Sequence, residues 1–324
     1  LKDAFDVFET EGLSIATVEN RVSVVKTFTE NLARLSDGVR RLRELRRECF
    51  DDFRPDAVIT DFEPMTAYLA DHHGLPLVTI DNQHRMRYMR YPRPEHLRRD
   101  ALVTETVIRA MVPRPSVSLV TTFWFGDVTN ERTFLFPPIL RAEVLRRARE
   151  EHPPDPDAPV LVYFTQGCDS FLDRLRALPR ERFRVYWVPT AGREAREDNL
   201  EFLPPSREGF LDDLAACKAV VATAGFTLIT EALHLGKPYR ALPMRGQFEQ
   251  ELNAVLLEDS GCGRNGRDAG DETLGDFLYR LPEHRAALAR YPRADNSAIL
   301  ARLDALLADD CAEARAFRDR RRDR

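Results

Sequence analysis

A turn between a predicted strand and a predicted helix has the composition of a phosphate-binding site. Residues 219–222 form an apolar strand pattern, residues 223–226 (Thr-Ala-Gly-Phe) form a turn, and residues 227–235 have the spacing of a helix. The first N–H groups of a helix lack partners within the helix and lie at the positive end of its dipole. Gly225, having no side chain, would let an anion approach this backbone closely. The pattern predicts a phosphate site here, although the same residues could form a tight turn that binds no ligand.

Polar side chains near this turn have the chemistry to bind sugar hydroxyls. Glu231 lies one turn into the helix, where a carboxylate can accept hydrogen bonds from both hydroxyls of a ribose. Complementation of the helix dipole, or a solvated surface position, would explain the same residue. A second polar cluster follows Gly246 at the start of another predicted helix and comprises Gln247, Glu249, Gln250 and Asn253. Such side chains suit a hydroxyl-rich ligand, but an acid-rich helix start would need no ligand.

Titratable residues follow two predicted strands in the first half of the chain. Asp61 comes directly after the strand at 57–60, and His84 follows the strand at 77–80. Carboxyl ends of parallel strands are where open α/β sheets bind ligands, so either residue could act as a general base. Two alternatives stay open. Asp61 could cap the following helix, and His84 could be a solvent-exposed loop histidine.

The elements that must position these residues alternate between short apolar runs and amphipathic segments, which is typical of βαβ units. Strands are predicted at 57–60, 77–80, 116–124, 160–164, 183–188, 200–203 and 219–222, and helices at 29–53, 65–72, 207–216, 227–235, 297–307 and 313–324. A proline-dense segment near 153–159 reads as a linker. We therefore expect an N-terminal domain at 1–141, a linker at 142–158, and a C-terminal domain at 159–324 that includes the terminal helices.

Composition excludes several other classes of protein. A chain of 324 residues with 43% hydrophobic residues and a net charge of −5 indicates two soluble domains and no nucleic-acid partner. The five cysteines have no CxxC spacing, and no acidic pair or His cluster is placed for a metal. The odd number and wide spacing of the cysteines indicate a reducing cytoplasm, and no apolar run is long enough to span a bilayer. The Arg- and aromatic-rich stretch at 85–93 is either an ordinary loop or a surface for a lipid-linked acceptor or the inner face of the membrane.

The stretch from residue 223 to residue 254 resembles the donor-site signature of GT-B UDP-sugar transferases. The wording is TAGFTLITEAL at 223–233, GKP at 236–238 and GQFEQELNA at 246–254. It is similar to transferases related to the peptidoglycan lipid-intermediate N-acetylglucosaminyltransferase, in particular a bacterial and archaeal subgroup. ITDFEP at 59–64, TIDNQH at 79–84 and PPILR at 137–141 also resemble that subgroup. The resemblance implies two Rossmann-like domains that face each other across a cleft.

The resemblance also implies a role for each matching residue. Glu231 would hold the ribose, and Asn253 would brace the sugar-binding loop formed with Gln247, Glu249 and Gln250. Uracil would lie near Leu203 and Pro204. The diphosphate would be bound by backbone groups of Thr165, Gly167, Ala224, Gly225, Phe226 and Thr227.

The implied reaction is transfer of a hexose or N-acetylhexosamine from a UDP-sugar, with inversion, without a metal or other cofactor. The implied acceptor is a small molecule, a glycan or a lipid-linked acceptor. Members of this family begin with a Gly-rich GxGH-like loop that is not found in this chain, so we expect the N-terminal domain to lack its first strands. A UDP-sugar epimerase and a non-catalytic nucleotide-sugar-binding protein are the alternatives.

Overall fold

The chain forms two compact units in the computed structural model. The structure describes residues 7, 17–18, 21–22, 42–150, 155–164, 169–187, 196–267 and 274–322. The first unit comprises Leu1–Pro137 together with Ser297–Arg324, and the second unit comprises Pro138–Asn296.

A parallel sheet of the first unit positions its candidate residues. Its strands run in the order β3 (Val58–Thr60), β4 (Leu77–Asp81), β5 (Val117–Thr121) and β6 (Thr133–Phe136). The first three confirm predicted strands, whereas β6 had not been predicted. The other elements of this unit are β1 (Thr17–Val18), β2 (Arg21–Val22), the π-helix η1 (Arg46–Asp52), α3 (Pro64–His73), α4 (Arg85–Tyr88), the 3-10 helix η2 (Glu95–Leu97), α5 (Arg98–Met111) and α13 (Ser297–Arg322).

Local sequence explains why α3 begins and ends where it does. Pro64 occupies the first turn, and the Glu63 carboxylate accepts hydrogen bonds from the backbone N–H groups of Met65 and Thr66, both at 2.8 Å. The helix ends at Gly74, which has a left-handed φ of 67°. The cap is therefore Glu63, and the interpretation of Asp61 as the helix cap is wrong.

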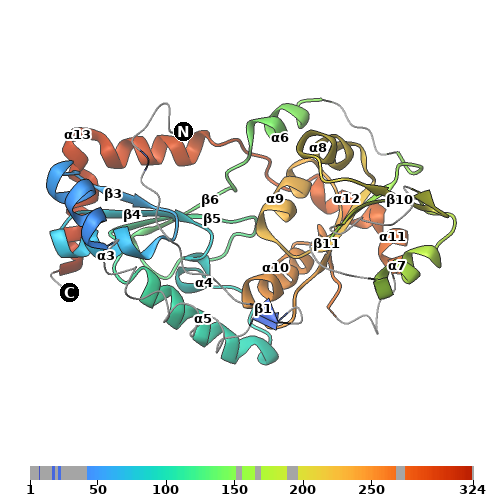
Figure 1. Ribbon diagram of the computed structural model, residues 1–324, viewed down its shortest axis with the longest axis horizontal. Helices are drawn as coiled ribbons and strands as arrows, with labels where there is room; N and C mark the ends of the chain where they lie inside the picture. Colours follow the sequence, from blue (N-terminus) through green and yellow to red (C-terminus); the bar gives the residue numbers. More distant parts are fainter. Residues whose placement is uncertain are drawn as a thin grey trace. The chain divides into compact units, whose positions relative to one another are not determined.

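The C-terminal helix α13 belongs to the first unit and covers one face of its sheet, opposite the side on which α5 lies (Figure 1). Its buried residues Ile299, Leu306 and Phe317 pack with Val78 of β4 and Leu119 of β5. Left-handed backbone at residues 309–311 interrupts the helix, where the sequence predicts a break between two helices. The expected C-terminal domain at 159–324 included this helix. The structure differs, because the apolar face of α13 is buried against β4 and β5 of the first unit.

A larger sheet forms the centre of the second unit. Its order is β13-β12-β11-β7-β8-β10-β9, and all neighbouring strands are parallel except β10 and β9. The strands are β7 (Val160–Phe164), β8 (Phe183–Trp187), β9 (Arg196–Glu197), β10 (Leu200–Leu203), β11 (Ala219–Thr223), β12 (Tyr239–Leu242) and β13 (Gly263–Asn265). Those predicted at 160–164, 183–188, 200–203 and 219–222 are confirmed.

Helices surround this sheet and bury its apolar side chains, including Val162, Val185 and Val221 (Figure 1). They are α6 (Ala142–Arg147), α7 (Asp169–Arg176), α8 (Arg207–Ala216), α9 (Phe226–His234), α10 (Phe248–Asp259), α11 (Leu274–Tyr279) and α12 (Leu281–Leu288). The expected linker at 142–158 contains α6, which belongs to the second unit.

The stretch at 85–93 begins with the short helix α4 (Arg85–Tyr88), continues as a loop at 90–93, and does not form an exposed basic surface. Arg85, Met86 and Met89 are almost fully buried, and only Arg90 and Arg93 are exposed. Within the described part of the chain, no helix combines the length and the apolar character needed to cross a membrane. Most of the helix predicted at 29–53 lies outside the described residues.

Candidate functional site

The order of strands in the second unit defines where a ligand can bind. From β7 the chain proceeds to β8 and β10 on one side, and to β11, β12 and β13 on the other. The carboxyl ends of β7 and β11 therefore lie at the point where the strand order reverses. In open α/β sheets, this switch point opens a crevice for a ligand.

The turn from β11 into α9 is shaped by Gly225. This residue is the N-cap of α9 with φ −69° and ψ 136°, and no side chain caps the helix. A Cβ atom at Gly225 would have no neighbour within 4 Å. Neither the backbone conformation nor packing in the protein requires a glycine here. An open approach to the first N–H groups of α9 is what an anion site needs.

Glu231 of α9 is buried, but its carboxylate keeps some hydrogen-bond acceptor positions free of protein donors. Its side chain is 3% exposed and forms a bidentate ion pair with Arg141, with Nε–Oε1 and Nη2–Oε2 distances of 2.7 and 2.8 Å. The hydrogen bond to Glu231 raises the pKa of Arg141. A carboxylate offers about four acceptor positions, so the pair leaves about two for further donors. The solvated-surface alternative for Glu231 is therefore wrong.

A cavity of about 500 Å³ opens beside Glu231 and Thr227. One wall is aromatic, because the Phe210 ring packs edge-on against Tyr163 and Tyr186 at centroid distances of 5.4 and 5.0 Å. Burial raises the pKa of Tyr186, whose hydroxyl also donates to Asp213. The remaining lining residues are Arg141, Pro205, Ser206, Arg207 and Leu228. The volume falls within the range of roughly 300–1,000 Å³ that is usual for small-molecule sites.

Asn253 stabilises the turn between β11 and α9 by a buried hydrogen bond. Its side chain is fully buried, and its Nδ2 donates to the carbonyl oxygen of Ala224 at 2.8 Å. The Tyr239 hydroxyl similarly donates to the carbonyl of Thr223 at 2.6 Å. The bracing role predicted for Asn253 agrees with this geometry, and its contact with the donor sugar stays a prediction.

The other polar residues at the start of α10 have mixed surroundings. Gln247 is the N-cap of α10 without a side-chain capping bond, and Glu249 is half-buried in the first turn. The Gln250 Oε1 accepts from the backbone N–H of Met244 at 3.0 Å. Gln250 therefore shapes the preceding loop, and sugar contacts by these three residues stay a prediction. Thr165 and Gly167 lie outside the described residues.

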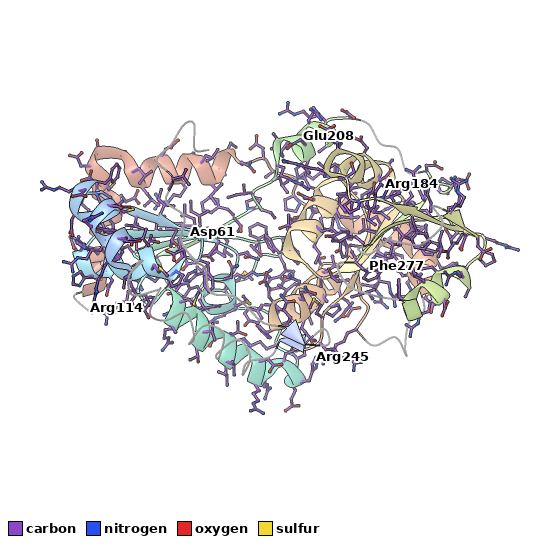
Figure 2. The ribbon with its side chains drawn as sticks, viewed as in Figure 1. Asp61, Arg114, Arg184, Glu208, Arg245 and Phe277 are labelled. Carbon is purple, nitrogen blue, oxygen red and sulfur yellow. The ribbon has the colours of Figure 1, made fainter. Side chains whose placement is uncertain are left out.

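The first unit brings Asp61, Asp81 and His84 to the carboxyl edge of its own sheet. Asp61 lies just past β3 and is exposed (Figure 2). The carboxylate is nevertheless partly desolvated by its surroundings, and this desolvation, followed by the charge of Asp81, raises the pKa of Asp61. His84 is fully buried, with its Nδ1 2.6 Å from Oδ2 of Asp81 and its ring stacked on Tyr88. The exposed-loop alternative for His84 is wrong, and Asp61 is the more accessible of the two candidate bases.

Several residues of this site were not assigned by the sequence. Arg141 was noted only as part of a motif, and nothing local shows that it meets Glu231. Tyr163, Tyr186 and Phe210 had no assigned role, although the two tyrosines lie near strand ends, which is a usable signal. The cavity is lined by residues 205–207 rather than by Leu203 and Pro204. Among the described residues, no cluster of His, Cys, Asp or Glu could hold a metal.

A strand-order switch point with a glycine turn and a helix N-terminus is an arrangement with which α/β proteins bind phosphate-containing ligands. Residues 1–282 match Glycosyl transferase family 1, and the chain belongs to this family. An uncharacterized glycosyltransferase of Methanosarcina acetivorans is 23% identical over 248 residues, covering 72% of this chain and 64% of that protein. The chain thus spans less than two thirds of the length of this relative.

Several solved structures that match the fold of this chain are glycosyltransferases. The calicheamicin glycosyltransferase CalG4 matches with a TM-score of 0.60 and 18% identity, over 89% of this chain and 82% of that chain. UGT89C1 of Arabidopsis thaliana, complexed with UDP-L-rhamnose, matches with a TM-score of 0.58 and 20% identity, over 89% and 78%. The expected GT-B fold is thereby confirmed. The likeness to the peptidoglycan N-acetylglucosaminyltransferase stays a prediction.

Proposed function

We propose that the protein transfers a hexose or N-acetylhexosamine from a UDP-sugar to an acceptor hydroxyl, with inversion. The observation that carries the proposal is the cavity beside Glu231 at the switch point of the second unit. Family membership supports glycosyl transfer, and the complex of UGT89C1 with UDP-L-rhamnose supports a nucleotide-sugar donor for this fold. The proposed acceptor is a small molecule, a glycan or a lipid-linked molecule.

In this proposal the second unit holds the donor. The diphosphate lies against the first N–H groups of α9, which Gly225 leaves accessible. The ribose hydroxyls donate to the acceptor positions of Glu231 that Arg141 leaves free. Arg141 acts as a positioning residue, because its bidentate contact fixes the plane of the carboxylate. The base stacks on the aromatic wall formed by Tyr163, Tyr186 and Phe210.

The proposed reaction is a single displacement at the anomeric carbon. Asp61 takes the proton of the acceptor hydroxyl, and its raised pKa makes it a better base than an ordinary aspartate. The acceptor oxygen forms a bond to the anomeric carbon while the bond to the β-phosphate oxygen breaks. UDP leaves with its charge stabilised by the backbone donors at α9 and without a metal.

Calorimetric titration with UDP tests the donor site. We expect Glu231→Gln to weaken UDP binding about tenfold to a hundredfold, because charge-assisted hydrogen bonds are worth about 1.5–3 kcal/mol. Glu208→Gln is the matched control, since Glu208 lies exposed in the first turn of α8 (Figure 2). Equal UDP affinity in both variants would contradict the assignment. Incubation with a UDP-sugar alone, followed by mass spectrometry, separates a transferase from an epimerase.

A further inference from the structure

A second cavity of the second unit lies at the opposite ends of the strands from the candidate donor site. Its volume is about 240 Å³. Cys217 and Lys218 line it directly before β11, and Leu235, Gly236 and Lys237 line it before β12. It therefore lies at the amino ends of these strands, whereas the candidate donor site lies at their carboxyl ends. The other wall is formed by Ala148, Glu150, Asp155, Arg285, Leu288, Ala289 and Arg293.

Lys237 is a buried cation without a counter-charge. It is 8% exposed, and within the described ranges its side-chain ammonium group forms neither a hydrogen bond nor an ion pair. Lys218 differs, because its Nζ lies 2.5 Å from a carboxylate oxygen of Glu181. Burying an unpaired charge is costly, so natural proteins pair such groups or use them.

Two guanidinium groups add to the positive charge. Among the residues that the structure describes, Arg285 donates to the backbone carbonyl of Lys218, at 3.3 Å, and to no carboxylate. Arg293 lies against Gly236, so closely that a Cβ atom there would be 2.5 Å from its Nη2. Burial lowers the pKa of Lys237, and the charges of Arg285 and Arg293 lower it further, against an opposing effect of Cys217. The three cations thus repel one another around one cavity.

The acidic residues of the cavity do not neutralise this cluster. Glu150 and Asp155 are both exposed, whereas Lys237 is buried. Asp155 Oδ1 accepts from the backbone N–H of Asp157 at 2.8 Å, and Glu150 has another interaction of its own. Neither carboxylate forms an ion pair with Lys237, Arg285 or Arg293 among the residues described.

We propose that this cavity binds the phosphate group of a small anion, at a site separate from the donor site. Arginine matches phosphate oxygens with paired N–H donors, and lysine adds a compact charge. The volume of about 240 Å³ lies below the range of roughly 300–1,000 Å³ for drug-sized ligands. Inorganic phosphate, pyrophosphate and a sugar phosphate share the required chemistry. The competing explanation is that Lys237 and Arg293 complement the carboxyl end of the α9 dipole and bind nothing.

Calorimetry and thermal unfolding with three probes test the site. Inorganic phosphate, pyrophosphate and glucose 1-phosphate are titrated at constant ionic strength, with and without UDP. We expect at least one probe to bind and to raise the melting temperature more than chloride does. Its affinity should fall at least tenfold in Lys237→Met and in Arg293→Gln. Comparison of the three probes shows which source of phosphate the cavity prefers.

Arg290→Gln is the matched control, because Arg290 is exposed near Arg293 and does not line the cavity. Without any anion, Lys237→Met should raise the melting temperature, since an uncompensated charge is removed. If Lys237→Met does not fold, the exposed Arg293→Gln still decides. The site is excluded if no probe exceeds chloride, or if Arg293→Gln binds as tightly as Arg290→Gln. Binding that UDP abolishes and the substitutions leave unchanged would place the probe in the donor site instead.

Discussion

Two carboxylates of this protein lie in contrasting surroundings. Glu231 is buried and held by Arg141, so its charge is compensated and its direction is fixed. Asp61 is exposed and lies near the like charge of Asp81. A carboxylate of fixed direction suits binding, and one with a raised pKa suits proton transfer, so the two fit different roles in the proposed reaction.

We expect Asp61→Asn to raise the melting temperature at pH 7. Burial, and then the charge of Asp81, raise the pKa of Asp61 in the folded protein, so ionisation is less favourable there than in the unfolded chain. Below the unfolded pKa of about 3.9, the neutral carboxyl group of Asp61 therefore contributes to the stability of the folded protein. This contribution is lost as the pH rises through the higher pKa that Asp61 has in the folded protein. An amide removes the loss at pH 7.

Thermal unfolding of Asp61→Asn between pH 3 and pH 8 measures this effect. The advantage over the wild type should shrink toward the acidic end, where both side chains are neutral. Asp304→Asn, at an exposed position of α13 in the same unit, is the control. An equal gain in the control would show that only net charge matters. Transferase activity should be lost in Asp61→Asn and kept in Asp304→Asn.

At the scale of elements, the fold does not explain why a glycine occupies position 225 in the β11–α9 turn. Glycine is typical of positions that need a left-handed backbone or a close approach of another group to the chain. Gly263 is such a case, because a Cβ atom there would lie 2.0 Å from the carbonyl oxygen of Tyr239. Gly225 has φ −69° and open space in front of it. The glycine is therefore better explained by a bound anion than by folding.

We expect Gly225→Ala to fold normally and to lose nucleotide binding. Its stability should stay within about 1 kcal/mol of the wild type, because the conformation suits alanine and only a weak cap is lost. UDP affinity should fall about tenfold or more, since the methyl group would occupy the path of the diphosphate. Thermal unfolding and calorimetry measure the two effects separately.

Gly263→Ala is the control, and in contrast to Gly225→Ala it should reduce stability. It should lower the melting temperature, because the backbone of β12 must move to admit the methyl group. A Gly225→Ala protein that binds UDP like the wild type would remove the main support for a phosphate site at this turn.

At the scale of the whole molecule, two units with separate cores imply separate stabilities. The C-terminal helix α13 completes the core of the first unit, although it follows the second unit in the sequence. Leu306→Ala should lower the unfolding free energy of the first unit by about 2–5 kcal/mol, because a fully buried side chain is lost. Leu300→Ala, at a position 54% exposed on the same helix, should change it by at most about 0.5 kcal/mol.

Amide hydrogen exchange measures where Leu306→Ala acts. Exchange should accelerate in β4 and β5, which α13 covers, and stay unchanged in β7 and β11 of the second unit. UDP affinity at 25 °C should also be unchanged, since every residue of the donor cavity lies in the second unit. Equal acceleration in both sheets would show that the two units unfold as one.

The sequence alone determined most elements that carry the candidate site. Strands β7 and β11 and helices α8 and α9 follow from hydrophobic periodicity within a few residues, with glycine and proline marking their ends. The polar residues at those ends are predictable for the same reason. The sequence therefore predicts that Gly225 and Glu231 belong to one turn and the helix that follows it, and the structure confirms this.

Only the tertiary structure decided which distant residues meet. The Arg141–Glu231 pair, the Asn253 bond to Ala224 and the packing of α13 on β4 and β5 join parts of the chain far apart in sequence. No local pattern specifies these partners, because an apolar face or a charged side chain fits any complementary surface. Which surface it finds depends on strand order and on burial of the whole core.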